Sequence, residues 1–256
     1  MILKNVEPYI QGLKAEYKER IKNFKEAPKL AIIQVGETKI ASIGIENKVK
    51  DCEEVGVVVD VYIYPENITE FELDNELAHM QEHYDGVVIQ MPLPPHIRSS
   101  IASAAPNKDV GGTCTDSWFD AVVPKGIMGY LEYCGYDISG RDVVIIGRGE
   151  ATGRALAKRM VAANATVTLC HSQSKLSKYI YDCDLLVSAV GKAGFLNCYP
   201  IHVPIIDIGM SVNEDGKVVG DCYNIENRDV LNQVDLLTRC ALLENVIESK
   251  ERSMDG

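Results

Sequence analysis

The sequence lacks the features that mark several other classes of protein. No apolar run reaches the length of about 18 residues that a membrane-spanning helix needs, so we expect no membrane span. The first residues, Met1–Asn5, show no apolar core of a secretory signal peptide. The eight cysteines are scattered and form no C-x-x-C pair, which favours free thiols in a reducing cytoplasm over disulfides or a zinc site.

Basic residues are too few for a general nucleic-acid-binding protein. The net charge is −11, and neutralising phosphates requires clustered Lys and Arg. No Ser/His/Asp triad and no cluster of metal ligands is apparent, so we assign no metal site. The chain has 256 residues, of which 46% are apolar and 25% charged, as expected for a globular protein of one large or two modest domains.

The segment from Asp142 to Gly153 carries the clearest functional signal. Val143–Ile146 is a continuous β-branched apolar run, which predicts a buried strand, and a helical pattern begins at Arg154. A strand, a glycine-rich turn and a helix N-terminus form an anion site, because N–H groups and the positive end of the helix dipole point at a phosphate. The glycines of the turn are Gly147, Gly149 and Gly153.

Their spacing, G-x-G-x-x-x-G, is one residue longer than the commonest dinucleotide fingerprint. A glycine turn between a strand and a helix can also be purely structural. The context favours a bound dinucleotide, because further strand-like runs alternating with helices predict a parallel, doubly wound sheet. These runs are Thr166–Cys170, Asp184–Ala189 and Ile205–Gly209.

The first third of the sequence predicts a second, smaller α/β domain of βαβαβ type. A capping box of Thr69 and Glu72 begins one of its helices. Met91–Pro95 cannot continue the third strand, because proline lacks the N–H that a sheet requires. The three strands are expected at Leu30–Val35, Val57–Tyr64 and Gly86–Gln90.

Two residues of this domain are candidates for chemistry. Gln90 follows the carboxyl end of a strand, where ligands bind in open α/β sheets. Lys48 lies on a predicted helix, where most lysines are solvated surface charges. A catalytic lysine needs burial or a neighbouring group to adjust its pKa, and a nearby Gln90 amide could orient it. His171, at a strand end, suits a phosphate or ribose contact better than catalysis.

Many segments in the same order give this chain a family resemblance. It resembles the bifunctional methylenetetrahydrofolate dehydrogenase/methenyltetrahydrofolate cyclohydrolase family over nearly its whole length. The segments that carry the resemblance are Lys48–Gly56, Asp85–Pro94, Asn107–Val110, Pro124–Ile127, Val144–Arg148, Thr166–Ser172, Asp184–Lys192, Ile206–Gly209 and Gly216–Asp221.

The resemblance implies two α/β domains with a cleft between them, and a cytoplasmic homodimer. The N-terminal substrate domain would span residues 1–118, joined by 238–256 as the last helix packs back, and a Rossmann-like domain would span 119–237. The implied activity, part of one-carbon metabolism, is oxidation of 5,10-methylenetetrahydrofolate with NADP. Hydrolysis of the methenyl product to 10-formyltetrahydrofolate would follow.

The same resemblance assigns residues to roles. Lys48 matches the catalytic lysine, and Gln90 matches the glutamine that holds and tunes it. The predicted substrate-binding residues are Gly44, Lys48, Ile89, Gln90, Met91, Pro92 and Gly111. The predicted cofactor-binding residues are Gly147, Arg148, Gly149, Gly153, His171, Ser172, Val190, Gly191 and Met210.

We prefer NADP to NAD as the cofactor. No Asp or Glu lies near Cys170, about 20 residues after the glycines, where an acidic residue usually reads a free ribose 2′-hydroxyl. Arg148 and Ser172 could accept a 2′-phosphate.

The sequence departs from the family at three places that concern the folate site. Where the family carries a tyrosine one helical turn before the lysine, this sequence has Gly44. Glycine inside a helix costs up to ~1 kcal/mol relative to alanine. Where the family carries an aspartate that anchors the pterin, this sequence has Gly111, although Asp109 or Asp116 could substitute for that aspartate. A Gly/Pro-rich loop before the last helix is missing, and Val234–Cys240 runs nearly straight into that helix.

These departures leave alternatives open. One is a non-catalytic paralogue that binds a dinucleotide but has lost the folate site. Another is a different small-molecule dehydrogenase with the same two-domain architecture.

Overall fold

The computed structural model describes residues 5–97, 104–223 and 228–254. The chain forms two compact units. The N-terminal unit comprises Ile10–Val122 together with the chain from Arg239 onward. The central unit comprises Val123–Thr238 together with the described residues up to Tyr9. Each unit is built on a parallel sheet of its own, as the sequence predicts.

The sheet of the N-terminal unit has three strands in the order β2-β1-β3. They are β1 (Lys29–Val35), β2 (Val58–Tyr64) and β3 (Gly86–Ile89), all parallel. The central strand β1 is buried along nearly its whole length because it reads as a continuous apolar run. The edge strand β2 alternates between exposed and half-buried residues.

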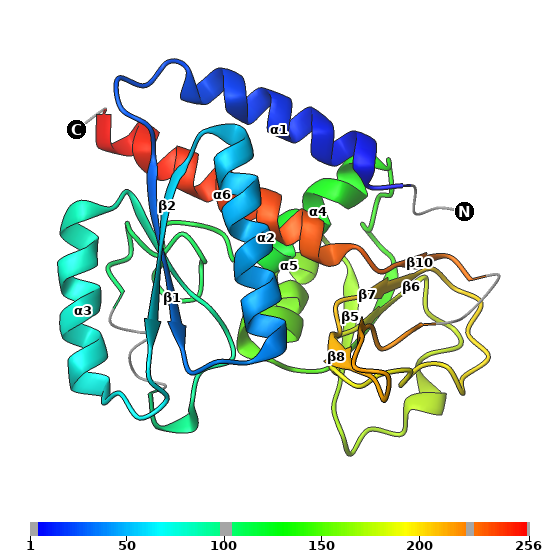
Figure 1. Ribbon diagram of the computed structural model, residues 1–256. Coiled ribbons are helices and arrows are strands. Elements are labelled where there is room, and N and C mark those ends of the chain that lie inside the picture. The colour runs from blue at the N-terminus through cyan, green and yellow to red at the C-terminus, as the bar shows by residue number, and fades with distance from the viewer. Residues whose placement is uncertain (1–4, 98–103, 224–227, 255–256) are drawn as a thin grey trace. The chain divides into compact units, whose positions relative to one another are not determined.

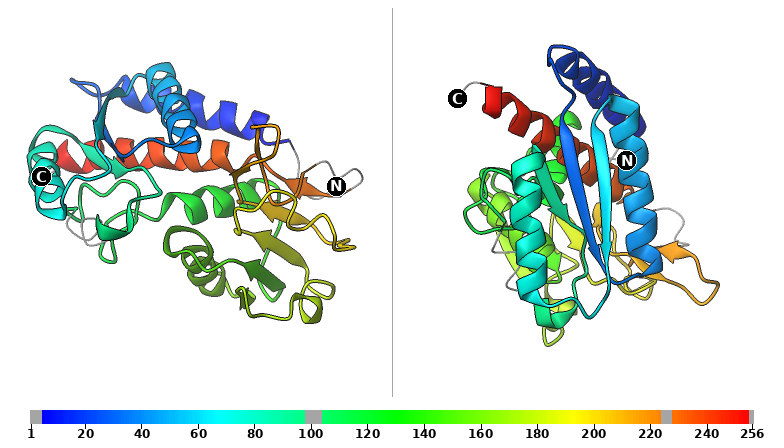
Figure 2. Two further views of the ribbon diagram at one scale, coloured as in Figure 1. Left: turned by 60° about the horizontal axis from the view of Figure 1, so that its bottom comes forward. Right: turned by 60° about the vertical axis from the view of Figure 1, so that its left-hand side comes forward.

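Three helices lie wholly or mainly in this unit, and two of them have ends that the sequence marks with capping residues. They are α1 (Glu7–Ile21), α2 (Lys39–Val55) and α3 (Glu70–His83). Gly56 ends α2 in the left-handed conformation, with φ of 94°. The capping box of Thr69 and Glu72 at the start of α3 is confirmed. Figures 1 and 2 show α2 and α3 on opposite sides of β1 and β2, so each helix buries one face of the sheet.

The sheet of the central unit has five parallel strands in the order β10-β7-β6-β4-β5. The strands are β4 (Asp142–Ile146), β5 (Thr166–Cys170), β6 (Leu185–Ser188), β7 (Ile205–Asp207) and β10 (Val230–Leu231). Buried residues from β4, β5, β6 and β7 share one core cluster, which includes Val144, Leu186 and Ile205. The parallel sheet predicted from the apolar runs is therefore confirmed.

The expected alternation of strands and helices holds only partly in this unit. Helices α4 (Val122–Tyr133) and α5 (Ala155–Ala162) flank β4, but β5 leads to β6 through a short 3-10 helix, η4 (Leu176–Lys178). The connection from β6 to β7 is irregular because it contains Gly191, Gly194 and two prolines, which oppose helix formation.

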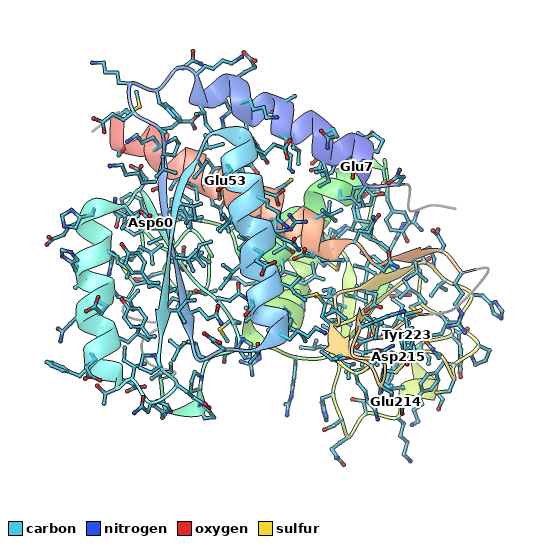
Figure 3. The ribbon with its side chains drawn as sticks, viewed as in Figure 1. Glu7, Glu53, Asp60, Glu214, Asp215 and Tyr223 are labelled. Atoms are coloured by element: carbon cyan, nitrogen blue, oxygen red, sulfur yellow. The ribbon has the colours of Figure 1, made fainter. Side chains whose placement is uncertain are left out.

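Two further elements differ in detail from the sequence pattern. The predicted turn with one short strand is a small antiparallel hairpin of β8 (Ser211–Val212) and β9 (Val218–Val219). Its turn presents Glu214 and Asp215, which Figure 3 labels. The last helix, α6 (Val234–Met254), already begins at Val234, so the residues expected to lead into it are helical.

The carboxyl-terminal part of α6 packs back on the N-terminal unit, as expected. The Arg239 guanidinium pairs with the buried Asp51 carboxylate of α2. Asn245 donates to the Val110 carbonyl at 2.8 Å, and Ser249 donates to the Asp85 carbonyl at 2.6 Å. In the part of the chain that is described, no helix is both long and apolar enough to span a membrane.

Candidate functional site

The glycine turn of the central unit is enforced by close backbone contacts. Gly147 follows β4 with φ of +108°, and a Cβ there would overlap the Ala189 carbonyl. A Cβ at Gly153 would overlap the carbonyl oxygen of Gly147 itself. A larger residue at Gly147 would require the turn to move away from the segment after β6, and one at Gly153 would require β4 and the following helix to separate. The turn therefore has the close strand–helix approach that a phosphate-binding loop requires.

The helix that follows starts with a wider turn. Glu150–Arg154 forms one π turn before α5 begins, and the Arg154 N–H donates to the Gly149 carbonyl at 3.0 Å. No side chain caps this end of the helix, so its first N–H groups are not covered by a capping residue. The extra residue in the glycine spacing is accommodated in this π turn.

The predicted cofactor contacts lie at the carboxyl ends of four neighbouring strands. Because the strands are parallel, their carboxyl ends lie at one edge of the sheet. Val190 and Met210 are 38% and 47% exposed there, although both side chains are apolar. The exposed residues that follow these strands are Arg148 after β4, His171 and Ser172 after β5, Val190 and Gly191 after β6, and Met210 after β7.

Two buried carboxylates, Asp207 and Asp221, hold the loops at this edge of the sheet, and the sequence analysis missed them. Asp221 is fully buried and accepts hydrogen bonds from the Ser188 hydroxyl at 2.6 Å and from the Val190 N–H at 2.8 Å. It also accepts from the Lys192 N–H at 2.7 Å. Asp221 thereby fixes the loop after β6, which contains the predicted cofactor residues Val190 and Gly191.

Asp207 ties the loop after β7 to the segment that contains Asp221. Its carboxylate accepts from the N–H groups of Gly209 at 3.1 Å, Asp221 at 3.2 Å and Cys222 at 2.8 Å. Burial, together with the nearby Asp221 charge, raises the pKa of Asp207 to about 6. A Cβ at Gly209 would overlap Asp221, and one at Gly220 would overlap Asp207. The sequence signal was a strand ending in Asp207, with Gly220 and Asp221 following 13 and 14 residues later.

In the N-terminal unit, the side-chain amide of Gln90 holds the amine of Lys48. The Lys48 Nζ lies 2.9 Å from Gln90 Oε1 and 3.5 Å from the Gly44 carbonyl oxygen. The Gln90 Nε2 donates to the Met91 carbonyl at 2.9 Å, which turns the acceptor oxygen toward the lysine. The Gln90 N–H donates to the Ile33 carbonyl at 2.7 Å and so anchors the residue at the end of β3. The structure brings together the two residues to which we assign catalysis.

Gly44 lies directly beside this pair. A Cβ there would stand 3.7 Å from the Lys48 Nζ and 3.8 Å from the Gln90 Nε2, which are ordinary contact distances. A side chain at this position would therefore touch both residues. Met91 and Pro92, also predicted to bind substrate, are exposed next to Gln90, and Ile89 is half-buried.

Gly111 gains no replacement carboxylate from Asp109. Asp109 is 3% exposed, and its Oδ2 accepts from the N–H groups of Thr113 and Cys114, both at 2.7 Å. These bonds direct the carboxylate to its own loop. A Cβ at Gly111 would lie 3.4 Å from Asp109 Oδ1, so there is space for a small side chain. Asp116 is exposed on the same loop, where it could reach a ligand only if the loop shifts.

The fold and these sites define a class: a two-unit α/β protein with a glycine turn between a strand and a helix in one unit and a lysine site in the other. The family models agree over most of the chain. Residues 5–111 match the catalytic domain of tetrahydrofolate dehydrogenase/cyclohydrolase, and residues 121–254 match its NAD(P)-binding domain. The chain belongs to the tetrahydrofolate dehydrogenase/cyclohydrolase family.

Individual relatives match over most of their length. The bifunctional protein FolD of Methylibium petroleiphilum is 35% identical over 269 residues, which cover 94% of each chain. The FolD of Staphylococcus carnosus is 33% identical over 87% of this chain and 82% of its own. Among solved structures, the bifunctional FolD enzyme of Campylobacter jejuni superposes with a TM-score of 0.86 at 30% identity and covers 96% of this chain and 97% of its own.

Proposed function

We propose that this protein oxidises 5,10-methylenetetrahydrofolate with NADP and hydrolyses the methenyl product to 10-formyltetrahydrofolate. The family assignment supports both steps, because its two domains cover the chain. The observation that carries the proposal is the 2.9 Å hydrogen bond between Lys48 and Gln90, beside the exposed Met91.

Lys48 and Gln90 supply proton chemistry in this proposal. A general acid or base must lie within hydrogen-bond reach of the reacting group and must be held in a defined orientation. The amide oxygen of Gln90 fixes Nζ on one side, and Nζ can hold or release a proton on another. Hydrolysis consumes one water and releases one proton, which Lys48 is placed to accept as the water adds.

NADP would supply the hydride acceptor when bound. We propose that Gly147, Gly149 and Gly153 receive its diphosphate at the start of the helix, as their contacts permit. Arg148 and Ser172 are both exposed after neighbouring strands, where they would face the 2′-phosphate. His171 would contact the same part of the cofactor. Val190, Gly191 and Met210 would line the remainder of the nucleotide.

The wider organisation belongs to the same proposal. We assign residues 1–118 and 238–256 to the substrate domain and 119–237 to the NADP domain, and we propose a cytoplasmic homodimer. Eight free cysteines are consistent with a reducing compartment. Light scattering of the purified protein at micromolar concentration would measure the mass of the assembly, and a monomer mass would contradict the dimer.

The two activities are tested separately on the purified protein. NADPH formation from methylenetetrahydrofolate reports the oxidation, and the loss of the methenyl chromophore reports the hydrolysis. We expect both to exceed the rates without protein. NADP binding without either activity would overturn the proposal in favour of the non-catalytic paralogue.

A further inference from the structure

A histidine cluster on α3 lies outside both sites described above. His79, Glu82 and His83 occupy the last turns of the helix, and all three are exposed. Their potential ligand atoms lie within 4.8 Å of one another. The two imidazole rings are 4.5 Å apart between centroids, at an angle of 72°.

The helical repeat explains why these side chains converge. Residues three and four apart lie on the same face of a helix, and the cluster uses both spacings. The opposite face of α3 is buried through Leu73, Leu77 and Met80 in the core of the N-terminal unit. Since the core fixes that face, the cluster faces away from the sheet that α3 covers in Figure 2.

The donor atoms of the cluster take no part in the hydrogen bonds and ion pairs seen among the described residues. The hydrogen bonds and ion pairs among the described residues do not engage the imidazole nitrogens of His79 and His83 or the carboxylate of Glu82. The nearby Glu76 is different, because the Tyr64 hydroxyl donates to it at 2.9 Å. Three adjacent donor groups are therefore available on a rigid helix.

The donor set selects a class of metal ion. Two imidazoles and one carboxylate suit Zn²⁺, Ni²⁺ and Cu²⁺, whereas Mg²⁺ and Ca²⁺ prefer oxygen ligands alone. Bonds from zinc to nitrogen are about 2.0–2.1 Å long, so the donor atoms must approach to roughly 3–3.5 Å. The exposed side chains can do so by rotating about their own bonds.

The order of the residues, His-x-x-Glu-His, also occurs in a class of zinc peptidases. That chemistry requires a further protein ligand, and none joins the three residues of the cluster among the described residues. We propose that His79, Glu82 and His83 form a surface site that binds one divalent transition-metal ion, with the remaining positions taken by water. The site is independent of the proposed folate activity.

Calorimetric titration of the tag-free full chain with Zn²⁺, and separately with Ni²⁺, tests this site. The exposed Cys198 is replaced by serine in every sample, because a thiol could also bind zinc. We expect one equivalent to bind, and His79→Gln with His83→Gln to lower the affinity about tenfold or more. Glu82→Gln should weaken binding less. The matched control is His202→Gln, another exposed histidine, which should bind as the parent does.

A thermal melt of each variant without metal checks that the fold is intact. Zn²⁺ should raise the melting midpoint of the parent and the His202 variant but not that of the double variant. The proposal is overturned if no equivalent binds, or if binding is unchanged in the double variant. Unchanged folate turnover on adding Zn²⁺ would support its independence from the proposed activity.

Discussion

The glycine turn of the central unit and the lysine site of the N-terminal unit are constrained in different ways. The turn is fixed by backbone contacts, because Cβ atoms at Gly147 and Gly153 would overlap main-chain carbonyls. The lysine site depends on a hydrogen bond between two side chains, from the Lys48 amine to the Gln90 amide oxygen. A change at the turn would disturb folding, whereas a change beside the lysine would alter chemistry and leave the fold intact.

This difference explains where the chain departs from its family. At Gly44 and Gly111, where the resemblance leads us to expect a tyrosine and an aspartate, a Cβ would meet neighbours only at 3.4 Å or more. The glycines of the turn have no such freedom. Four predictions test this contrast, from the largest expected effect to the smallest.

Gly153→Ala should be the most damaging single change. Its methyl group would overlap the Gly147 carbonyl, so β4 and the following helix must separate, at a cost of about 3 kcal/mol or more. Urea unfolding and NADP calorimetry measure the two consequences, which are lower stability and lost NADP binding. Gly12→Ala is the matched control, since nothing lies within 4 Å of its Cβ. Equal stability of the two variants would contradict the backbone constraint.

Gln90→Asn should damage chemistry and leave the fold intact. The shorter side chain withdraws the amide oxygen from Lys48 Nζ by about one bond length, and a misplacement of that size can lower a rate about 100-fold. We expect kcat for hydrolysis of the methenyl form to fall while the affinity for NADP is unchanged. Steady-state kinetics and calorimetry separate these quantities. A parallel loss of NADP affinity would show that the two sites are not separable in this way.

Asp207 should make stability depend on pH. Its pKa is raised from 3.8 to about 6 in the folded protein, so the native state binds the proton more tightly than the unfolded state. The stability from this group is present at low pH and is lost as pH rises through about 6. Between pH 4 and pH 7 the free energy of unfolding of Asp207→Asn, compared with that of the wild type, should therefore rise by up to roughly 2–3 kcal/mol.

Urea unfolding at several pH values measures the difference between this variant and the wild type. The same substitution at the exposed Asp215 of the hairpin controls for the change of residue type. A difference that does not vary with pH would show that Asp207 does not titrate in this range.

Gly44→Ala should have the smallest effect. Alanine is favoured over glycine inside a helix by about 0.5–1 kcal/mol, and the added methyl meets Lys48 and Gln90 at ordinary distances. We expect a small rise in the free energy of unfolding, measured in urea, with folate turnover retained. Destabilisation would mean that Gly44 is required by packing, and the contrast with the glycine turn would then fail.

The sequence predicts well what depends on local pattern. Continuous apolar runs located β1 and β4, Gly56 ended α2, and the Thr69 capping box began α3. Contacts between distant segments were not predictable in the same way. The Asp207 carboxylate accepts from the Asp221 N–H, and the Asp221 carboxylate accepts from Ser188, only because β6, β7 and the segment after the hairpin come together.

Local pattern was also overlooked in one case. The sequence analysis found no metal cluster, yet His79 and His83 are four residues apart on a helix that it did predict. The spacing alone could have indicated the cluster. By contrast, the π turn at Glu150–Arg154 and the irregular connection from β6 to β7 depend on how the loops pack.

The most direct test of the account is the rate of hydrolysis of methenyltetrahydrofolate, followed as loss of the methenyl chromophore, in Lys48→Ala compared with Lys50→Ala. Lys50 is an exposed lysine on the same helix, and both variants should bind NADP with the affinity of the wild type. We predict a loss of about 100-fold or more in the Lys48 variant and none in the Lys50 variant. Equal rates in the two variants would contradict the assignment of catalysis to Lys48.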